Sequence, residues 1–153
     1  MVDTELQPVA PPWAPSPTAV ATPTEQVETA ARKKWGVSAD AGFQIVPDTL
    51  FRCQKLLGLD AIDVVIILNV TLHQWYDDLP YPRPSIIAKR MAVSTRTVER
   101  HIESLEKKGF MRRLPSRPKK GKMIRPFDLS GLKSKLERYA TVNLERRGHS
   151  WGV

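Results

Sequence analysis

One segment in the middle of the chain, residues 84–110, constrains the fold more than any other part of the sequence. It reads PSIIAKRMAVSTRTVERHIESLEKKGF. Ser85 follows a proline and is expected to cap a first helix of about two turns. Ala88 in that helix is small, which lets a second helix cross close above it, and Ser94 is expected to cap the second helix. The segment therefore predicts two helices joined by a tight turn around Ala92.

The second helix, predicted over residues 94–108, has one apolar and one polar face. Val98, Ile102 and Leu105 recur at helical spacing and are expected to point into a core. The other faces carry Thr95, Arg96, Thr97, Arg100, Ser104 and Lys107. Hydroxyl groups and positive charge on an outer face are typical of a helix that contacts DNA. The alternative is an ordinary amphipathic helical hairpin whose charged face is solvated.

Positive charge is unevenly distributed along the 153 residues, which carry a net charge of +8. Residues 1–82 hold 5 basic and 10 acidic residues, whereas residues 83–153 hold 19 basic and 6 acidic residues. Nine of the basic residues lie within residues 107–125, where no acidic residue occurs. This asymmetry is expected of a surface that binds a polyanion, which by charge alone fits DNA, RNA or an anionic membrane.

A β-hairpin is predicted directly after the second helix. The stretches FMRRL and MIRPF are expected to form its strands, and SRPKKGK between them its basic turn. An amphipathic helix over residues 128–141 is expected to close the domain. Its apolar side carries Leu129, Leu132, Leu136 and Tyr139.

Upstream, the sequence predicts one strand and three helices. Residues 43–46 are a short apolar run expected to form a strand, and residues 24–35 a short helix. Asp48 or Thr49 is expected to cap the next helix, which Gly58 ends. Its core side chains are predicted to be Leu50, Phe51, Cys53, Leu56 and Leu57.

The longest helix is predicted over residues 60–77, with Asp60 as its cap and Asp63 in its first turn. Its apolar residues exceed one stripe, so this helix is expected either to be central to the fold or to be covered by a partner. That surplus, with the leucine face of the last helix, predicts a homodimer.

The pattern A-x-x-x-A-V-S-x-x-T-V-x-R-x-I-x-x-L, which begins at Ala88, and the KKGF that follows it carry a resemblance to a known family. The chain resembles the winged helix-turn-helix of bacterial, phage and plasmid regulators and replication proteins, over about residues 43–139. Many such motifs have glycine where this chain has Ala92, so this residue is expected to avoid a positive φ or to accept modest strain. The implied fold is α+β and mostly helical, with a three-helix core, a β-hairpin wing and an additional C-terminal helix.

The resemblance implies sequence-specific binding of double-stranded DNA, with the helix at residues 94–108 in the major groove. The residues expected to contact bases are Thr95, Arg96, Thr97 and Arg100. Those expected to contact the DNA backbone are Ser85, Lys89, Ser94, Arg117, Lys119, Lys120 and Lys122. A replication initiator and a transcriptional regulator both fit this description. The alternative is a winged-helix module that binds protein or RNA.

The domain is predicted to span residues 41–142. Residues 1–40 begin with a proline-rich stretch and are expected to form a disordered tail, whose P-x-x-P spacings suit docking to a protein partner. Residues 143–153 are expected to form a flexible tail. Neither a signal peptide nor a membrane span is found in the sequence, so we expect a cytoplasmic protein without membrane contact.

The sequence contains no recognisable catalytic or metal-binding constellation. Cys53 is the single cysteine and is best explained by packing, since no histidine or aspartate partner is evident. The adjacent Asp77 and Asp78 lack a third ligand at a supporting spacing, and the three histidines show no metal-binding spacing. We therefore expect no metal, no cofactor and no enzymatic activity.

Overall fold

The computed structural model describes residues 23–72, 74 and 78–148, and the chain divides into two compact units, residues 1–44 and 45–153. In the described part of the first unit, α1 (Pro23–Trp35) is followed by the 3-10 helix η1 (Gly36–Ala41). The predicted helix at residues 24–35 is confirmed, with Glu25 in its first turn and basic residues in its last turn, as the helix dipole favours. The prediction of disorder is wrong for residues 23–40, which are helical; the P-x-x-P spacings lie outside the described residues.

The second unit begins with a connector and two short helices. No strand forms at residues 43–46, so that prediction is wrong. The chain instead enters α2 (Asp48–Arg52) through Pro47, and neither Asp48 nor Thr49 makes a side-chain cap. The predicted single helix is interrupted at Cys53, resumes as α3 (Gln54–Leu57) and ends at Gly58, whose φ is 69°.

These helices bury one face only. Leu50, Cys53 and Leu57, at helical spacing, are buried as predicted. Phe51 and Leu56 are 52% and 69% exposed, so their assignment to the core is wrong. They lie off the face that Leu50 and Leu57 define.

Helix α4 (Ala61–Thr71) is the centre of the fold. Its capping box is complete: the Asp63 backbone N–H donates to the Asp60 carboxylate at 2.7 Å, and the Asp60 N–H donates to the Asp63 carboxylate at 3.1 Å. Its buried apolar residues are Val64, Ile66, Ile67 and Val70. The helix is shorter than predicted, and of the predicted remainder residues 73 and 75–77 lie outside the described part. Other elements of the same chain cover most of the apolar surface of α4, while Val65 remains 41% exposed.

Helices α5 (Pro84–Met91) and α6 (Thr95–Lys107) form the predicted pair. Ser94 caps α6, since its hydroxyl accepts a hydrogen bond from the Thr97 N–H at 3.1 Å. Ser85 does not cap α5: proline occupies the first helical turn, where its missing N–H costs nothing, and Arg83 takes the cap position. Ala92 adopts the left-handed conformation, with φ 53° and ψ 40°, so of the two alternatives it accepts strain.

The inward face of the pair is as predicted. Ile87, Val98, Ile102 and Leu105 have no exposed surface, and Ala88 is 2% exposed where the two helices cross. The apolar spacing in α6 therefore fixes which of its faces remains outside.

Two small antiparallel sheets follow. β1 (Arg112–Arg113) pairs with β4 (Phe127–Asp128), and β2 (Arg117–Lys119) pairs with β3 (Lys122–Ile124). The hairpin is thus confirmed, but its turn is tighter than predicted. Only two residues separate β2 from β3, and both have positive φ, 47° at Lys120 and 74° at Gly121, which suits the strand twist.

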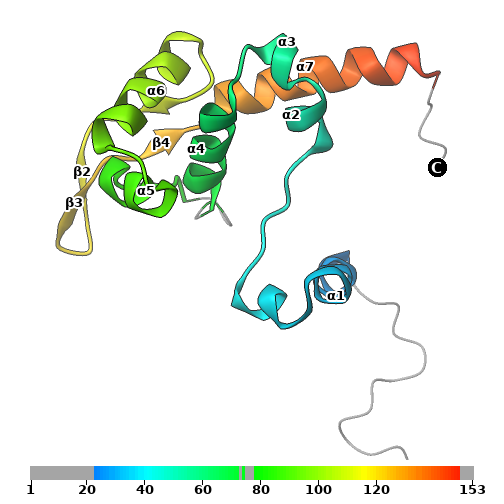
Figure 1. The fold of residues 1–153 in the computed structure, drawn as a ribbon, viewed down its shortest axis with the longest axis horizontal. Helices are drawn as coiled ribbons and strands as arrows, with labels where there is room; N and C mark the ends of the chain where they lie inside the picture. The colour runs from blue at the N-terminus through cyan, green and yellow to red at the C-terminus, as the bar shows by residue number, and fades with distance from the viewer. Residues whose placement is uncertain (1–22, 73, 75–77, 149–153) are drawn as a thin grey trace, which may run out of the picture. The chain divides into compact units, whose positions relative to one another are not determined.

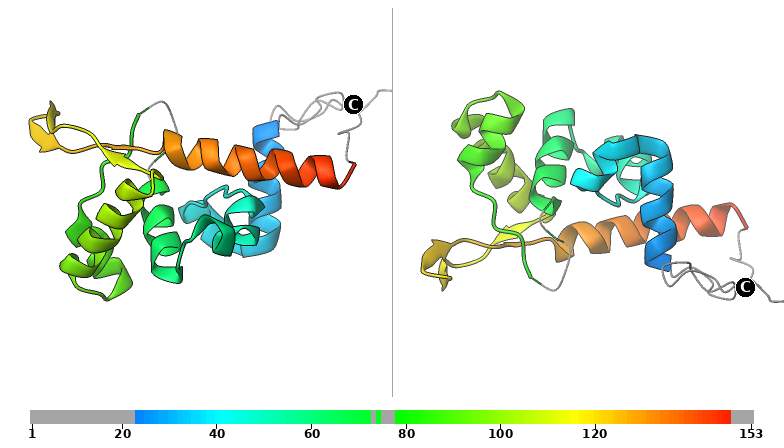
Figure 2. Two further views of the ribbon diagram at one scale, coloured as in Figure 1. Left: turned by 90° about the horizontal axis from the view of Figure 1, so that it is seen from above. Right: turned by 90° about the horizontal axis from the view of Figure 1, so that it is seen from below.

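Helix α7 (Ser130–Arg146) closes the unit and packs Leu132 and Leu136 into the core. It extends beyond the predicted end, so the flexible tail predicted from residue 143 is wrong as far as Arg146. Within the second unit, α4, α5 and α6 lie together, while the β2–β3 hairpin and the far end of α7 point away in opposite directions (Figures 1 and 2). The unit is mostly helical with a small β component, and none of the described helices is both long and apolar enough to cross a membrane.

Candidate nucleic-acid interface

The outer face of α6 presents Thr95, Arg96 and Arg100 to solvent. Among the residues that the structure describes, no carboxylate lies within 4.0 Å of either arginine. Thr97 differs from the other three predicted base contacts. It is half-buried, and its hydroxyl lies 2.8 Å from the Ser94 hydroxyl, so both groups are engaged in the cap.

Helix α5 and the residue before it add further cations. Ser85 and Lys89, both predicted to contact the DNA backbone, are exposed. Arg83 and Arg90 are also exposed, and the sequence reasoning missed both as candidates. Arg83 could have been predicted from its position just before Pro84, which begins α5. A residue at the start of a helix has a fixed backbone, while its side chain is exposed to solvent.

Part of the positive charge of residues 107–125 is neutralised by ion pairs in the folded chain. Four of their nine cations form ion pairs: Lys108 with Asp63, Arg112 with Asp128, Arg113 with Glu106 and Lys119 with Asp78. Each partner carboxylate lies outside residues 107–125. The cations for which no such pair is found in the described part are Lys107, Arg117, Lys120, Lys122 and Arg125.

Lys119 is the predicted phosphate contact whose surroundings fit the prediction least. Its ammonium group lies 2.8 Å from the Asp78 carboxylate and 5.0 Å from the centroid of the Tyr81 ring. The hydrogen bond from Lys119 lowers the pKa of Asp78 from its ordinary value, helped by the charges of Arg117 and Lys120. Lys119 therefore holds the hairpin against the connector before α5.

Arg113 and Glu106 attach the base of the strands to α6. The Glu106 carboxylate accepts hydrogen bonds from the Arg113 backbone N–H at 2.7 Å and from its guanidinium at 2.9 and 3.2 Å. Burial raises the pKa of Glu106, but the hydrogen bonds from Arg113 outweigh that effect, so the pKa is lowered. Charge-assisted bonds of this kind fix geometry as well as contribute energy.

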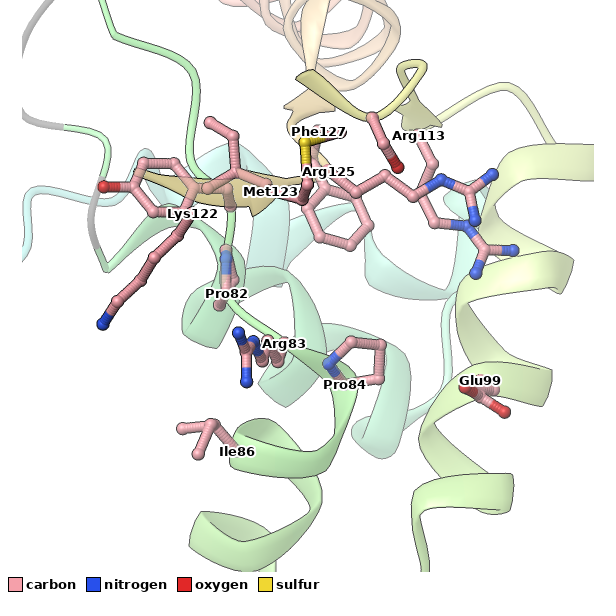
Figure 3. Close-up of a pocket in the computed structure, with 13 residues that line it drawn as sticks. Pro82, Arg83, Pro84, Ile86, Glu99, Arg113, Lys122, Met123, Arg125 and Phe127 are labelled. Carbon is pink, nitrogen blue, oxygen red and sulfur yellow. The ribbon is translucent and has the colours of Figure 1, made fainter. Parts of the chain in front are cut away.

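A groove of about 630 Å³ lies where the hairpin approaches α5. Figure 3 shows Lys122, Met123 and Arg125 of the hairpin segment on one side, Arg83 and Ile86 on the other, and Glu99 of α6 beyond them. The groove thus adjoins the exposed face of α6 through Glu99.

A second cluster, which the sequence did not predict, joins α6 to the start of α4. His101 Nδ1 lies 2.8 Å from the buried Asp63 carboxylate and 3.8 Å from that of Asp60. These three groups are close enough to share a cation. The Lys108 ammonium, 3.9 Å from Asp63, already brings positive charge to them, and we interpret the cluster as a structural link between the two helices. Asp63 and His101 are 38 positions apart, so no local pattern in the sequence predicts their contact.

These features define a small, mostly helical domain with a cationic face formed by a helix pair and a hairpin. Residues 46–147 match the model of the DnaD N-terminal domain family, and the chain belongs to this replication-related family. The fold is similar to the crystal structure of the N-terminal domain of DnaD protein from Geobacillus kaustophilus HTA426. The TM-score is 0.54 at 24% identity, covering 76% of this chain and 96% of that one. Comparison with curated proteins gives no match.

Proposed function

We propose that this protein binds double-stranded DNA in a sequence-specific manner during replication, with α5, α6 and the β2–β3 hairpin acting as a winged helix-turn-helix. The observation that carries the proposal is the position of Arg96 and Arg100, which are exposed on a helix whose opposite face is completely buried. Because the buried face holds the backbone of α6 in place, both arginines are presented to a ligand from fixed positions. The family to which the chain belongs favours replication over transcriptional regulation.

In this proposal, α6 enters the major groove. Arg96 and Arg100 lie about one turn apart and would each donate two hydrogen bonds to a guanine, through a planar fork that lysine lacks. Thr95 would contact a base edge or a phosphate. Thr97 is the weaker candidate, because its hydroxyl already takes part in the cap of α6.

Contacts with the phosphates would come from the residues around α6. On the helix pair these are Ser85 and Lys89, and on the hairpin Arg117, Lys120 and Lys122. Ser94, like Thr97, would contribute less, because its hydroxyl caps α6. Lys119 would contribute less than its neighbours, because it would first have to leave Asp78. The protein would act by binding and not by catalysis.

The decisive experiment compares two duplexes, one selected from a random pool for tight binding and one of random sequence. Replacing Arg96 or Arg100 with Ala should cost about 1 to 3 kcal/mol on the selected duplex and much less on the random one. Arg138→Ala, which removes an exposed arginine of α7, is the matched control. Equal losses on both duplexes would show that the arginines touch only phosphates, and failure to enrich any duplex would end the proposal.

A module that binds protein is the second candidate function. It is favoured by the large apolar side chains exposed on the second unit, Ile45, Phe51 and Leu56 among them. The apolar faces from which the sequence predicted a homodimer are largely buried within one chain, but Val65 of α4 is 41% exposed and a hollow lined by Leu129, Leu132 and Leu136 lies along α7. A homodimer would use these groups or the other exposed apolar residues. Sedimentation of the free protein and of its DNA complex tests this, and RNA in the same binding assay tests the RNA alternative.

A further inference from the structure

The groove between the hairpin and the start of α5 contains apolar groups for which duplex binding has no use, beside Lys122, which lies between this groove and the proposed duplex interface. Its volume of about 630 Å³ falls within the range of about 300 to 1,000 Å³ that is usual for ligand clefts. Such a space admits a short stretch of an extended chain. It is too small for a folded domain, and a duplex lying on α6 would pass beside it.

Three exposed apolar side chains line this groove. Tyr81 is 42% exposed, Ile86 45% and Met123 62%, and they come from the connector, α5 and β3. The Lys119 ammonium lies over the Tyr81 ring, so the opposite ring face is the one left for a ligand. Apolar groups gathered from three elements in one hollow indicate a contact site.

Positive charge borders these apolar groups. Arg83, Lys122 and Arg125 line the groove, and each is exposed. None of them has a carboxylate within 4.0 Å among the described residues. Arg113 also lines the groove but is paired with Glu106, which leaves Glu99 as the acidic group in the lining. The groove is therefore cationic overall.

We propose that this groove binds single-stranded DNA. Its bases would stack on Tyr81 and pack against Met123, while Arg83, Lys122 and Arg125 neutralise its phosphates. Aromatic groups beside a positively charged track are the combination that binds single strands without sequence preference. An acidic peptide satisfies the charges, but only a nucleic acid places a flat ring beside each negative group, which suits the exposed Tyr81 ring with cations next to it.

This inference does not depend on duplex binding. If both sites are used, however, their adjacency at Glu99 places the protein where a duplex opens into a single strand, since one site holds paired and the other unpaired DNA.

Fluorescence anisotropy with a labelled oligodeoxythymidine tests the inference on the full chain. Tyr81→Leu keeps apolar bulk but removes the ring, and it should weaken binding roughly ten-fold. The double variant Lys122→Ala with Arg125→Ala should lower the salt slope by about 0.7 for each phosphate that is no longer neutralised. Leu56→Ala and Lys133→Ala remove one exposed apolar group and one exposed cation elsewhere, and both should bind as the unmodified protein does.

Thermal unfolding checks that each variant folds. Should Tyr81→Leu prove unstable, the double variant decides alone, because both of its side chains are exposed. Unchanged affinity and salt slope in that variant would overturn the inference. So would tighter binding of a glutamate- and tryptophan-rich peptide that the same substitutions abolish, since the groove would then be a peptide site.

The duplex site is tested separately with Arg96→Ala. This variant should lose affinity for the selected duplex and keep its affinity for the single strand. Retained single-strand binding in a protein that binds no duplex would refute the proposed function and leave the groove assignment standing.

Discussion

The α5–α6 pair and residues 107–125 are both rich in positive charge, yet the folded chain neutralises them to different extents. In the described part of the structure, Lys89, Arg96 and Arg100 on the helix pair have no carboxylate within 4.0 Å. Of the nine cations in residues 107–125, four are paired with acids. These cations of the helix pair are therefore available to a ligand. In residues 107–125, nearly half of the cations instead form ion pairs that stabilise the fold.

The largest effect is expected from the buried side of the helix pair. Ile102 has no exposed surface, so Ile102→Ala should reduce the free energy of unfolding by about 2 to 5 kcal/mol. Leu56→Ala, at a position 69% exposed, should change it by about 0.5 kcal/mol or less. Urea denaturation measures both. Similar losses in the two variants would mean that α6 is not held by its apolar stripe.

A smaller effect is expected at the base of the strands. Glu106→Gln should cost about 1 to 3 kcal/mol, because it weakens charge-assisted hydrogen bonds to the mostly buried Arg113. The lowered pKa of Glu106 means that its contribution is complete above its ordinary value of 4.5 and is lost as the pH falls through the folded-state pKa. Unfolding free energies measured above and below that value should therefore show a shallower acid loss in the variant. An acid loss of unchanged size would assign it to other carboxylates.

Two neighbouring lysines of the hairpin are expected to differ in their contribution to DNA binding. Lys120→Ala should lower the slope of log affinity against log salt by about 0.9, if this exposed lysine meets one phosphate. Lys119→Ala should change the slope less, since its ammonium is bound to Asp78. Duplex titrations across about 50 to 200 mM salt compare them. A larger change for Lys119 would show that its ion pair opens on DNA.

The smallest effect concerns the turn of the helix pair. Ala92→Gly should raise the free energy of unfolding by about 0.5 to 1 kcal/mol, because glycine adopts φ 53° without strain but loses more entropy on folding. Replacing the neighbouring Val93 with glycine is the control, since it gains nothing from a left-handed turn. A loss of stability in Ala92→Gly would indicate that the alanine methyl group contributes to packing.

What the sequence predicted well was local. The stripe of Val98, Ile102 and Leu105, the cap at Ser94 and the two-stranded hairpin follow from residues within a few positions of one another. The break at Cys53 and the missing strand at residues 43–46 were not predicted, because apolar runs of this length suit several structures and packing chooses among them.

The charges of the site could be predicted only in part. Arg96 and Arg100 were correctly placed on the outside, since the stripe of their own helix decides it. Which lysines of the hairpin remain unpaired could not be predicted. Asp78 and Lys119 are 41 positions apart, and only the folded chain brings them together.

The division of the hairpin into two sheets bears on how this protein can diverge. The β1–β4 sheet includes the buried Phe127, whose N–H donates to the Pro80 carbonyl at 2.8 Å, whereas no residue of β2 or β3 is fully buried. Substitutions, insertions or deletions in β2 and β3 should therefore have little effect on the packing of the core. Over evolutionary time, or in the hands of an engineer, the length and charge of the tip can vary while the domain beneath it remains the same.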